Sequence, residues 1–287
     1  MKSISREEIK KLEEKSIRYR KLLLRIIFNA KAGHTGGSLS CVDILNVLYN
    51  HVMNITPDNF SDVDRDHYIH SKGHSVEALY AILGERGFFD LKELDSVEKY
   101  GSKFIGHPSR RIAGVEQNTG ALGHGLSVAV GMAMAVKKDE RLNFIYTLMG
   151  DGELTEGSIW EAAASAAHYC LDNLVTIIDR NRLQITGNTE DVMGMEPIDE
   201  KFRVFGFSVR RVDGHNIPDL VNIFDEVPFE KGKPNLIIAD TIKGKGVSFI
   251  ENQVDWHHHV PSEAEYEQAM AELNAAARAL GEVTIHA

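Results

Sequence analysis

Residues 144–181, FIYTLMGDGELTEGSIWEAAASAAHYCLDNLVTIIDRN, decide the fold of this chain. The apolar run Phe144–Met149 stops at Gly-Asp-Gly, an alanine-rich segment follows over Glu156–Tyr169, and the β-branched run Leu174–Ile178 ends in Asp-Arg-Asn. Short apolar runs separated by a helical segment are typical of buried parallel strands joined by a crossover helix. We therefore expect one strand–helix–strand unit here.

The same pattern continues toward the C-terminus. Phe207–Val212 and Leu236–Thr241 are further short apolar runs, with helical stretches between them. This alternation predicts an α/β fold, a doubly wound and mostly parallel sheet with helices on both faces. Ligands of such sheets bind beyond the carboxyl ends of the strands. The polar segments at those ends are Gly150-Asp151-Gly152, Asp179-Arg180-Asn181 and Lys243-Gly244-Lys245-Gly246.

Helices are also expected outside this alternation. Ser5 followed by Glu8 is a capping-box signal, and apolar residues at helical spacing follow it. The expected helices are a first one from Ser5 to about Lys31, ended by a glycine loop at Gly33–Gly37, short ones at Asp43–His51 and Ser75–Arg86, and a last one from about Ser262 to Leu280. No repeat or linker interrupts the chain, so we expect residues 1–287 to form a single domain with the first and last helices as extensions.

Composition excludes several classes of protein. The 287 residues include 32 Lys or Arg and 42 Asp or Glu, so the formal net charge is −10. An acidic chain without a basic stripe argues against binding nucleic acid or an anionic membrane. The longest apolar or glycine run, Val128–Val136, is too short to span a bilayer, and the charged N-terminus is unlike a secretory signal. The two cysteines, Cys41 and Cys170, both in apolar sequence surroundings, form no disulfide framework, so we expect a cytoplasmic protein.

Two polar residues follow neighbouring strands. Asp151 lies between glycines, which let a ligand approach the backbone, and Asn181 follows the next strand. One strand–helix–strand unit places both side chains at adjacent strand ends. Carboxylate, amide, main-chain and diphosphate oxygens together make a suitable octahedral set for Mg²⁺. The alternatives are that Gly-Asp-Gly is a plain turn and that Asn181 only caps one.

This pair resembles the thiamine-diphosphate motif, and other segments resemble transketolases. The similar segments are Gly33-His34-Thr35-Gly36-Gly37-Ser38, Arg65-Asp66 through Ser71-Lys72-Gly73-His74, Gly106-His107-Pro108, Thr119-Gly120-Ala121-Leu122-Gly123-His124-Gly125, and Lys243-Gly244-Lys245-Gly246 with Trp256-His257 downstream. They occur in the order of the family and span nearly the whole chain. The resemblance implies the thiamine-diphosphate-binding fold and the diphosphate-binding domain of a transketolase.

The resemblance also implies a role for individual residues. The metal, Mg²⁺ or alternatively Ca²⁺ or Mn²⁺, would be held by Asp151, the Asn181 side chain and the main-chain carbonyl of Leu183. The cofactor would contact His74, Gly120, Leu122, Gly150, Gly152, Asn181, Lys243 and His257, with Gly152, His74 and His257 at the diphosphate and Gly120 and Leu122 along the aminopyrimidine. The catalytic residues would be His34, His74, His107, His257 and Glu156. Of these, His34 and His107 would face the sugar hydroxyls, and Glu156 would lie at a subunit interface near the cofactor-activating acid of another chain.

The sequence departs from the family pattern after His257 and at Thr35-Gly36-Gly37, and it has a further histidine at His124. In the family a glycine follows the tryptophan-histidine pair, whereas here His258 and His259 follow His257. Neighbouring histidines do not easily converge on one ion, so we expect His258 and His259 at the surface and His257 toward the diphosphate. His124 is expected at a helix start. Thr35-Gly36-Gly37 replaces a proline-containing loop of many relatives, which would alter the donor pocket.

In the resembling enzymes a second domain supplies the glutamate that activates the cofactor. This sequence resembles only the first domain and stops after the last helix. We therefore expect the N-terminal subunit of a split transketolase, active only with a separate C-terminal subunit that carries this glutamate, in an α2β2 heterotetramer. The implied reaction transfers a two-carbon ketol unit from a ketose phosphate to an aldose phosphate, as in pentose phosphate metabolism.

Other functions are weighed against this one. A deoxyxylulose-phosphate synthase fragment or a keto-acid dehydrogenase subunit would also bind thiamine diphosphate, but Gly106-His107-Pro108 and the Trp256-His257 ending favour a transketolase. A non-catalytic thiamine-diphosphate-binding module remains a second alternative. A dinucleotide-dependent oxidoreductase is disfavoured because no G-x-G-x-x-G follows a strand.

Overall fold

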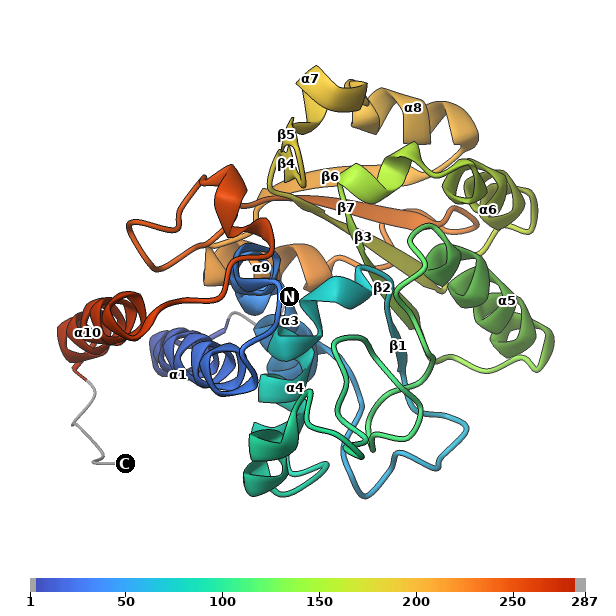
Figure 1. The fold of residues 1–287 in the computed structure, drawn as a ribbon. Helices are drawn as coiled ribbons and strands as arrows, with labels where there is room; N and C mark the ends of the chain where they lie inside the picture. Colours follow the sequence, from blue (N-terminus) through green and yellow to red (C-terminus); the bar gives the residue numbers. More distant parts are fainter. Residues whose placement is uncertain (1–3, 282–287) are drawn as a thin grey trace.

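A parallel five-stranded sheet forms the centre of the molecule. The computed structural model describes residues 4–281. The strands, in the spatial order β1-β2-β3-β7-β6, are β1 (His67–His70), β2 (Ile145–Gly150), β3 (Leu174–Arg180), β7 (Asn235–Asp240) and β6 (Ser208–Asp213). All four neighbouring pairs are parallel. The predicted α/β sheet is thereby confirmed, and Figure 1 shows helices on both sides of it.

Both faces of the sheet are buried. Along β2, Ile145 and Met149 belong to one hydrophobic cluster, whereas Tyr146 and Leu148 belong to the other. This alternation follows from the two-residue period of a strand, and it explains why the central strands are apolar at almost every position. One face is covered by α5 (His124–Lys138), α6 (Gly157–His168) and α8 (Ile198–Phe205), and the other by α1 (Arg6–Ala30), α3 (Val42–Val47), α4 (Val76–Glu85) and α9 (Ile217–Asp225).

The order of the strands explains which face each crossover helix covers. The connections through α5, α6 and α8 proceed from β1 toward β6 and lie on one face. The chain then returns from the edge strand β6 to β7, and α9 lies on the opposite face. Because strand–helix–strand connections are right-handed, reversing direction along the sheet moves the helix to the other side.

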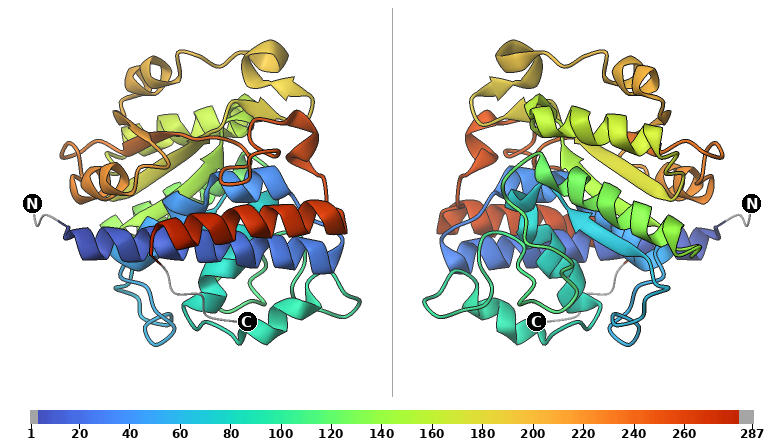
Figure 2. Two further views of the ribbon diagram at one scale, coloured as in Figure 1. Left: turned by 90° about the vertical axis from the view of Figure 1, so that its left-hand side faces the viewer. Right: turned by 90° about the vertical axis from the view of Figure 1, so that its right-hand side faces the viewer.

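Two long helices pack together outside the layer formed by α3 and α4. Helix α10 (Glu263–Ala279) lies beside α1, and Figure 2 shows the two running along each other. Each begins with a capping box: Ser5 and Glu8 bond reciprocally at α1, and Ser262 and Glu265 at α10. The expected first and last helices are therefore confirmed almost to the residue.

Shorter elements connect these parts. They are α2 (Thr35–Ser40), a π-helical turn (Leu48–Val52), 3₁₀ turns at Gly73–Ser75, Leu91–Ser96, Gly152–Thr155 and Val254–His257, the two-stranded hairpin β4 (Leu183–Gln184) and β5 (Gly187–Asn188), and α7 (Thr189–Met193). Among residues 4–281, no helix is both long and apolar enough to cross a membrane.

Several local predictions were wrong. Strand β1 was missed because its four residues include two histidines, and the β4–β5 hairpin was missed because each strand has only two residues. The expected glycine loop is partly helical, since Thr35 begins α2, and the expected helix at 43–51 changes to the π-helical turn at Leu48. Cys41 is buried, whereas Cys170, just after the end of α6, is exposed.

A buried ion pair ties the first helices to the sheet. The guanidinium of Arg20 on α1 donates two hydrogen bonds to the carboxylate of Asp43 on α3, at 3.0 and 2.6 Å, and a third to the Lys245 carbonyl at 2.9 Å. The His215 ring contacts the same carboxylate at 2.8 Å and accepts from the Ile242 amide. Burial opposes ionisation of Asp43, but Arg20 and His215 outweigh it and hold the pKa of the carboxyl well below its usual range.

We expect Arg20→Met to lower the free energy of unfolding by about 3 kcal/mol, because the substitution leaves the buried Asp43 carboxylate without its cation. Urea denaturation measures the change. The matched control is Arg25→Met, which changes an exposed arginine of the same helix and should alter stability by less than about 0.5 kcal/mol. Equal stability of the two variants would contradict this account of the pair.

Candidate functional site

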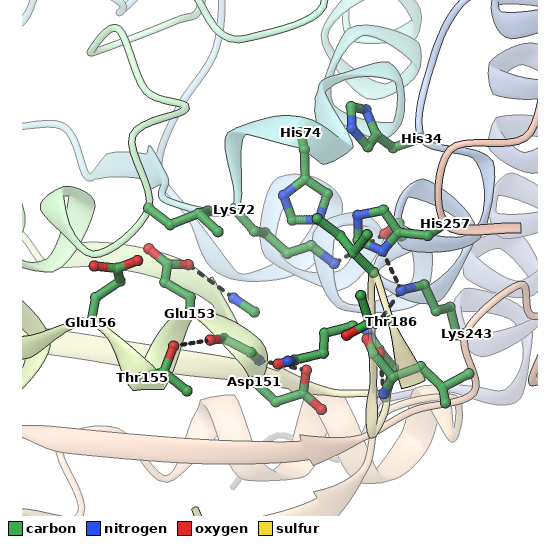
Figure 3. A pocket seen from close by; sticks show the side chains of 18 of the residues that line it. His34, Lys72, His74, Asp151, Glu153, Thr155, Glu156, Thr186, Lys243 and His257 are labelled. Carbon is green, nitrogen blue, oxygen red and sulfur yellow. Dashed lines mark hydrogen bonds between the residues drawn. The ribbon is translucent and has the colours of Figure 1, made fainter. Parts of the chain in front are cut away.

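A cavity of about 450 Å³ lies at the carboxyl ends of β2 and β3. The strand register places Gly150 opposite Asp179 and Arg180 opposite Asp240, so the segments that follow these strands meet at one edge. Figure 3 shows side chains from these segments and from the histidine loops converging on the cavity. The residues expected at the site that line it are His34, His74, Gly120, Leu122, Gly150, Asp151, Gly152, Glu156, Asn181, Leu183, Lys243 and His257.

The three expected metal ligands lie around one turn. The Asp151 carboxylate accepts hydrogen bonds from the amides of Gly152 (2.8 Å) and Arg182 (2.6 Å) and from the Arg180 guanidinium (3.1 Å). The Asn181 side-chain oxygen accepts from the Leu183 amide at 3.1 Å. These contacts hold the turn 181–183 against the end of β2, so that both side chains and Leu183 face one cavity.

The donor set fits a hard divalent cation. Asp151, Asn181 and the Leu183 carbonyl provide carboxylate, amide and main-chain oxygens, the ligand types that Mg²⁺ takes in proteins. Burial, with the nearby Asp179 charge, raises the pKa of Asp151, so a cation bound there would favour the ionised carboxylate. In the described part of the chain, no three or more His, Cys, Asp or Glu side chains gather so that they could hold a metal ion. The described residues therefore show no zinc site of the His and Cys type.

A second buried ion pair forms the floor of the cavity. Lys72, which follows β1, pairs with the Asp179 carboxylate at the end of β3 and donates to the Gly37 carbonyl at 3.0 Å. The same carboxylate accepts from the hydroxyls of Ser40 and Thr241. Burial opposes ionisation of Asp179, but the Lys72 charge and these donors lower its pKa below the usual value. Both residues stand in the motifs quoted above, but the sequence predicts no role for either.

The glycine loop at 119–125 is fixed by Glu153. Its buried carboxylate accepts from the amides of Gly123 (2.8 Å) and Gly150 (3.0 Å) and from the Ser71 hydroxyl. Gly123 has φ +85°, and a Cβ there would lie 2.6 Å from the Glu156 side chain, so only glycine fits. Glu153 thus positions Gly120 and Leu122 at the cavity. No sequence pattern predicts this role of Glu153, because the role depends on partners far away in the chain.

Imidazoles gather at the other side of the cavity. The His34 ring lies 5.3 Å from the His74 ring, 5.7 Å from the His257 ring and 6.3 Å from the His107 ring, measured between centroids. Burial lowers the pKa of His34 to about 4 and that of His257 to about 3, so both rings are neutral near pH 7. His34 Nδ1 is buried without a hydrogen-bond partner. An orphaned buried nitrogen of this kind fits a site that binds a polar ligand.

The amine of Lys243 lies between the two groups of residues. It donates to the Leu183 carbonyl at 3.0 Å and contacts His257 Nδ1 at 2.7 Å. Burial lowers the pKa of Lys243 to about 8, so most of the amine carries its charge at neutral pH. With Lys72, it places two amines among the carboxylates of Asp151, Glu153 and Glu156 that also line the cavity, and the Lys243 charge is available to a phosphorylated ligand.

The structure also gives the places of the remaining histidines. His107 does not line the cavity: its ring packs behind Gly120, where a Cβ would lie 2.6 Å from His107 Cδ2. His124 begins α5 and His258 and His259 are exposed, as expected. Further lining residues that sequence analysis did not name are Gln184, Ile185 and Thr186 of the β4–β5 hairpin and Thr155. A hairpin of two-residue strands leaves no periodic signal that would have found them.

The sequence matches the model of the transketolase thiamine diphosphate binding domain over residues 12–278. The chain belongs to the transketolase family. It is 47% identical over 267 residues to an apulose-4-phosphate transketolase subunit of Phocaeicola vulgatus, covering 93% of this chain and 95% of that protein. It is 43% identical over 255 residues to a 6-deoxy-6-sulfo-D-fructose transketolase subunit of Clostridium sp., covering 88% and 93% of the two chains.

Solved structures agree with the family. The transketolase of Campylobacter jejuni superimposes with a TM-score of 0.86 at 33% identity, over 92% of this chain and 42% of that one. The Leishmania mexicana transketolase gives a TM-score of 0.85 at 28% identity, over 92% and 41%. This chain therefore spans about two-fifths of the length of those transketolases. It corresponds to the N-terminal, thiamine-diphosphate-binding part of the family and has its fold.

The depressed pKa of His34 predicts a specific loss of stability in acid. Between the ordinary imidazole pKa, about 6.5, and the folded value, about 4, the unfolded chain binds a proton that the folded chain does not. Stability therefore falls as the pH drops through 6.5 and this loss ends near pH 4. We expect the free energy of unfolding of the wild type to decrease between pH 7 and pH 5 by about 1 kcal/mol more than that of His34→Asn, after allowance for the partial exposure of the ring.

Urea denaturation at both pH values measures this difference. The control is His168→Asn, an exposed histidine at the end of α6, which should keep the pH dependence of the wild type. If His34→Asn loses as much stability as the wild type, the His34 ring is not held neutral by its surroundings.

Proposed function

We propose that this chain is the diphosphate- and metal-binding subunit of a two-subunit transketolase. One observation carries the proposal: a single cavity joins hard oxygen donors at Asp151 and Asn181 to a group of neutral imidazoles around His34. Oxygen donors suit a metal-bound diphosphate, and imidazoles suit the hydroxyls of a sugar. Membership of the transketolase family supports the same assignment.

In this proposal Asp151, Asn181 and the Leu183 carbonyl hold Mg²⁺, with Ca²⁺ or Mn²⁺ as substitutes. The cofactor residues are His74, Gly120, Leu122, Gly150, Gly152, Asn181, Lys243 and His257, all of which line the cavity. Thiamine diphosphate supplies, when bound, the carbanion chemistry of a two-carbon transfer. The chain's own contribution is to bind and orient it: the amine of Lys243 offsets phosphate charge, and Gly152 leaves room for close approach.

The histidines serve the sugar phosphates. His34 offers an unpartnered buried nitrogen and is proposed to bind a hydroxyl group. His107 does not line the cavity, but its ring lies 6.3 Å from that of His34, so we propose that it binds a hydroxyl group at the edge of the cavity. His74 and His257, also neutral, can each donate one hydrogen bond and accept another without placing a charge in the cavity. These four histidines, with Glu156, are the proposed catalytic residues.

The proposal includes a partner subunit. Glu156 is exposed at the cavity, which is accessible from outside, and it would meet the C-terminal subunit that carries the activating glutamate. Relatives of nearly the same length are named as transketolase subunits, which supports a separate partner; we propose an α2β2 heterotetramer.

We further propose that the two described free cysteines reflect a reducing cytoplasm. The donor would be a ketose phosphate, with apulose 4-phosphate and xylulose 5-phosphate as the first to assay, and 6-deoxy-6-sulfo-D-fructose, which carries a sulfo group instead of a phosphate, as the comparison.

We expect transfer to require the partner subunit, thiamine diphosphate and Mg²⁺ together. Asp151→Ala should abolish it and weaken Mg²⁺-dependent binding of thiamine diphosphate by roughly 100-fold, because a carboxylate ligand is lost. Isothermal titration of the copurified complex measures the binding, and a coupled assay with ribose 5-phosphate as acceptor measures the transfer. The matched control is Asp139→Ala, an exposed carboxylate paired with Arg141, which should leave both unchanged.

The two measurements test the cofactor assignment and the donor sugars separately. Binding of thiamine diphosphate without transfer of any sugar would keep the cofactor assignment and refute these donors. Lack of binding by the complete complex would refute the cofactor assignment itself.

His107→Ala tests transketolase chemistry against the other enzymes that use the cofactor. Because His107 lies behind Gly120 and near the His34 ring rather than on the diphosphate side, we expect kcat/KM for sugar transfer to fall by at least about tenfold. The affinity for thiamine diphosphate should change less than about threefold by isothermal titration, equivalent to less than about 0.7 kcal/mol. His124→Ala, which alters an exposed histidine of the next loop, is the control. Unchanged transfer would favour a deoxyxylulose-phosphate synthase-like or keto-acid dehydrogenase-like activity.

A further inference from the structure

The segment that carries His258 is fixed on helix α2 by its neighbours. The buried Trp256 brings its carbonyl against Gly36, where a Cβ would lie only 2.8 Å from that oxygen. The His259 carbonyl accepts a hydrogen bond from the Thr35 hydroxyl at 2.7 Å, and the His259 ring packs on the Trp256 ring with centroids 4.3 Å apart. The backbone on both sides of His258 therefore has a defined place beside the loop that holds His34.

His258 itself lies at the edge of the imidazole group. Its ring centroid is 4.5 Å from that of His34, closer than the rings of His74, His107 or His257, and the two planes are nearly perpendicular. Unlike His34, His258 is exposed, and its side chain makes no hydrogen bond to any other residue of the described chain. A ring on a well-placed backbone, with two unused nitrogens, thus lies next to a cavity-lining histidine.

Solvent exposure and packing argue against a purely structural role. An exposed side chain contributes little to stability, and the contacts that fix this segment come from Trp256 and His259 rather than from His258. The ring nitrogens remain free to donate or accept one hydrogen bond each. The His258 ring lies beside the His34 ring, whose Nδ1 is buried without a hydrogen-bond partner. A polyhydroxylated ligand bound at His34 would therefore lie close enough to hydrogen-bond the His258 ring.

We infer that His258 is a specificity-determining residue, which hydrogen-bonds a hydroxyl of a sugar phosphate beside His34. The inference rests on the proposed function, since it names a further contact of that substrate. It adds a residue that the metal and cofactor sites do not use. The contact is expected to act on substrate binding and not on the affinity for thiamine diphosphate, because His258 is not one of the residues that line the cavity and lies outside it, beside His34.

Three variants distinguish a hydrogen bond from ring packing. His258→Phe keeps a ring against His34 but removes both nitrogens, His258→Gln keeps polar groups without the ring, and His258→Gly removes both. The matched control is His259→Phe, the same substitution at the next position, where an aromatic ring can still pack on Trp256. Steady-state kinetics of the two-subunit holoenzyme gives KM and kcat for the donor and the acceptor, and isothermal titration gives the affinity for thiamine diphosphate.

We expect His258→Phe and His258→Gly to raise the KM of one sugar phosphate about 3- to 10-fold, the range for one lost hydrogen bond, with kcat within about twofold. His258→Gln should recover part of the loss, and His259→Phe should match the wild type. Thiamine diphosphate affinity should be unchanged throughout.

Three results would overturn the inference. A normal KM in both His258→Phe and His258→Gly would show that the ring does not touch the substrate. A raised KM in the glycine variant alone would assign His258 to packing over His34. A loss of thiamine diphosphate affinity would place it in the cofactor site. Absence of transfer by the wild type would instead refute the proposed function, and the inference with it.

Discussion

The buried pair of Lys72 and Asp179 is the interaction on which the rest of the site depends. It joins the end of β1 to the end of β3, and its hydrogen bonds reach Gly37 and Ser40 on α2 and Thr241 after β7. Four segments that are far apart in sequence thus share one set of polar contacts. A buried charge without its partner costs several kcal/mol, so the segments take this arrangement together or not at all.

The site contains both paired charges and neutral buried imidazoles. Charged groups at its floor form ion pairs with groups of opposite charge, as Asp151 does with Arg180. The imidazoles at its other side are kept neutral by burial. Neutral rings can approach one another at 5–6 Å without repulsion, which protonated rings could not do cheaply. The net charge of −10 does not exclude an anionic ligand, because the amines of Lys72 and Lys243 line the cavity beside its carboxylates.

Much of this arrangement could be predicted from local patterns. The apolar runs before Gly150 and Asp179 gave two central strands, because strands buried on both faces need apolar side chains at successive positions. Ser5 with Glu8 marked the start of α1, since a capping box is a contact between neighbours in sequence. Strand β1 left no such signal because it is held by pairing with the distant strand β2, and the β4–β5 hairpin left none because its two strands pair over only two residues each.

By itself the sequence determined the α/β class, the helix starts and most of the residues that line the cavity, because strand ends, caps and glycine-flanked histidines are local patterns. Only the tertiary structure decided that Lys72 pairs with Asp179, that Glu153 holds Gly123, that His107 lies behind Gly120 and that His258 stands beside His34. Each of these depends on a distance between groups remote in the chain. Such distances are fixed only when the layers of helix and sheet pack and their buried polar groups find partners.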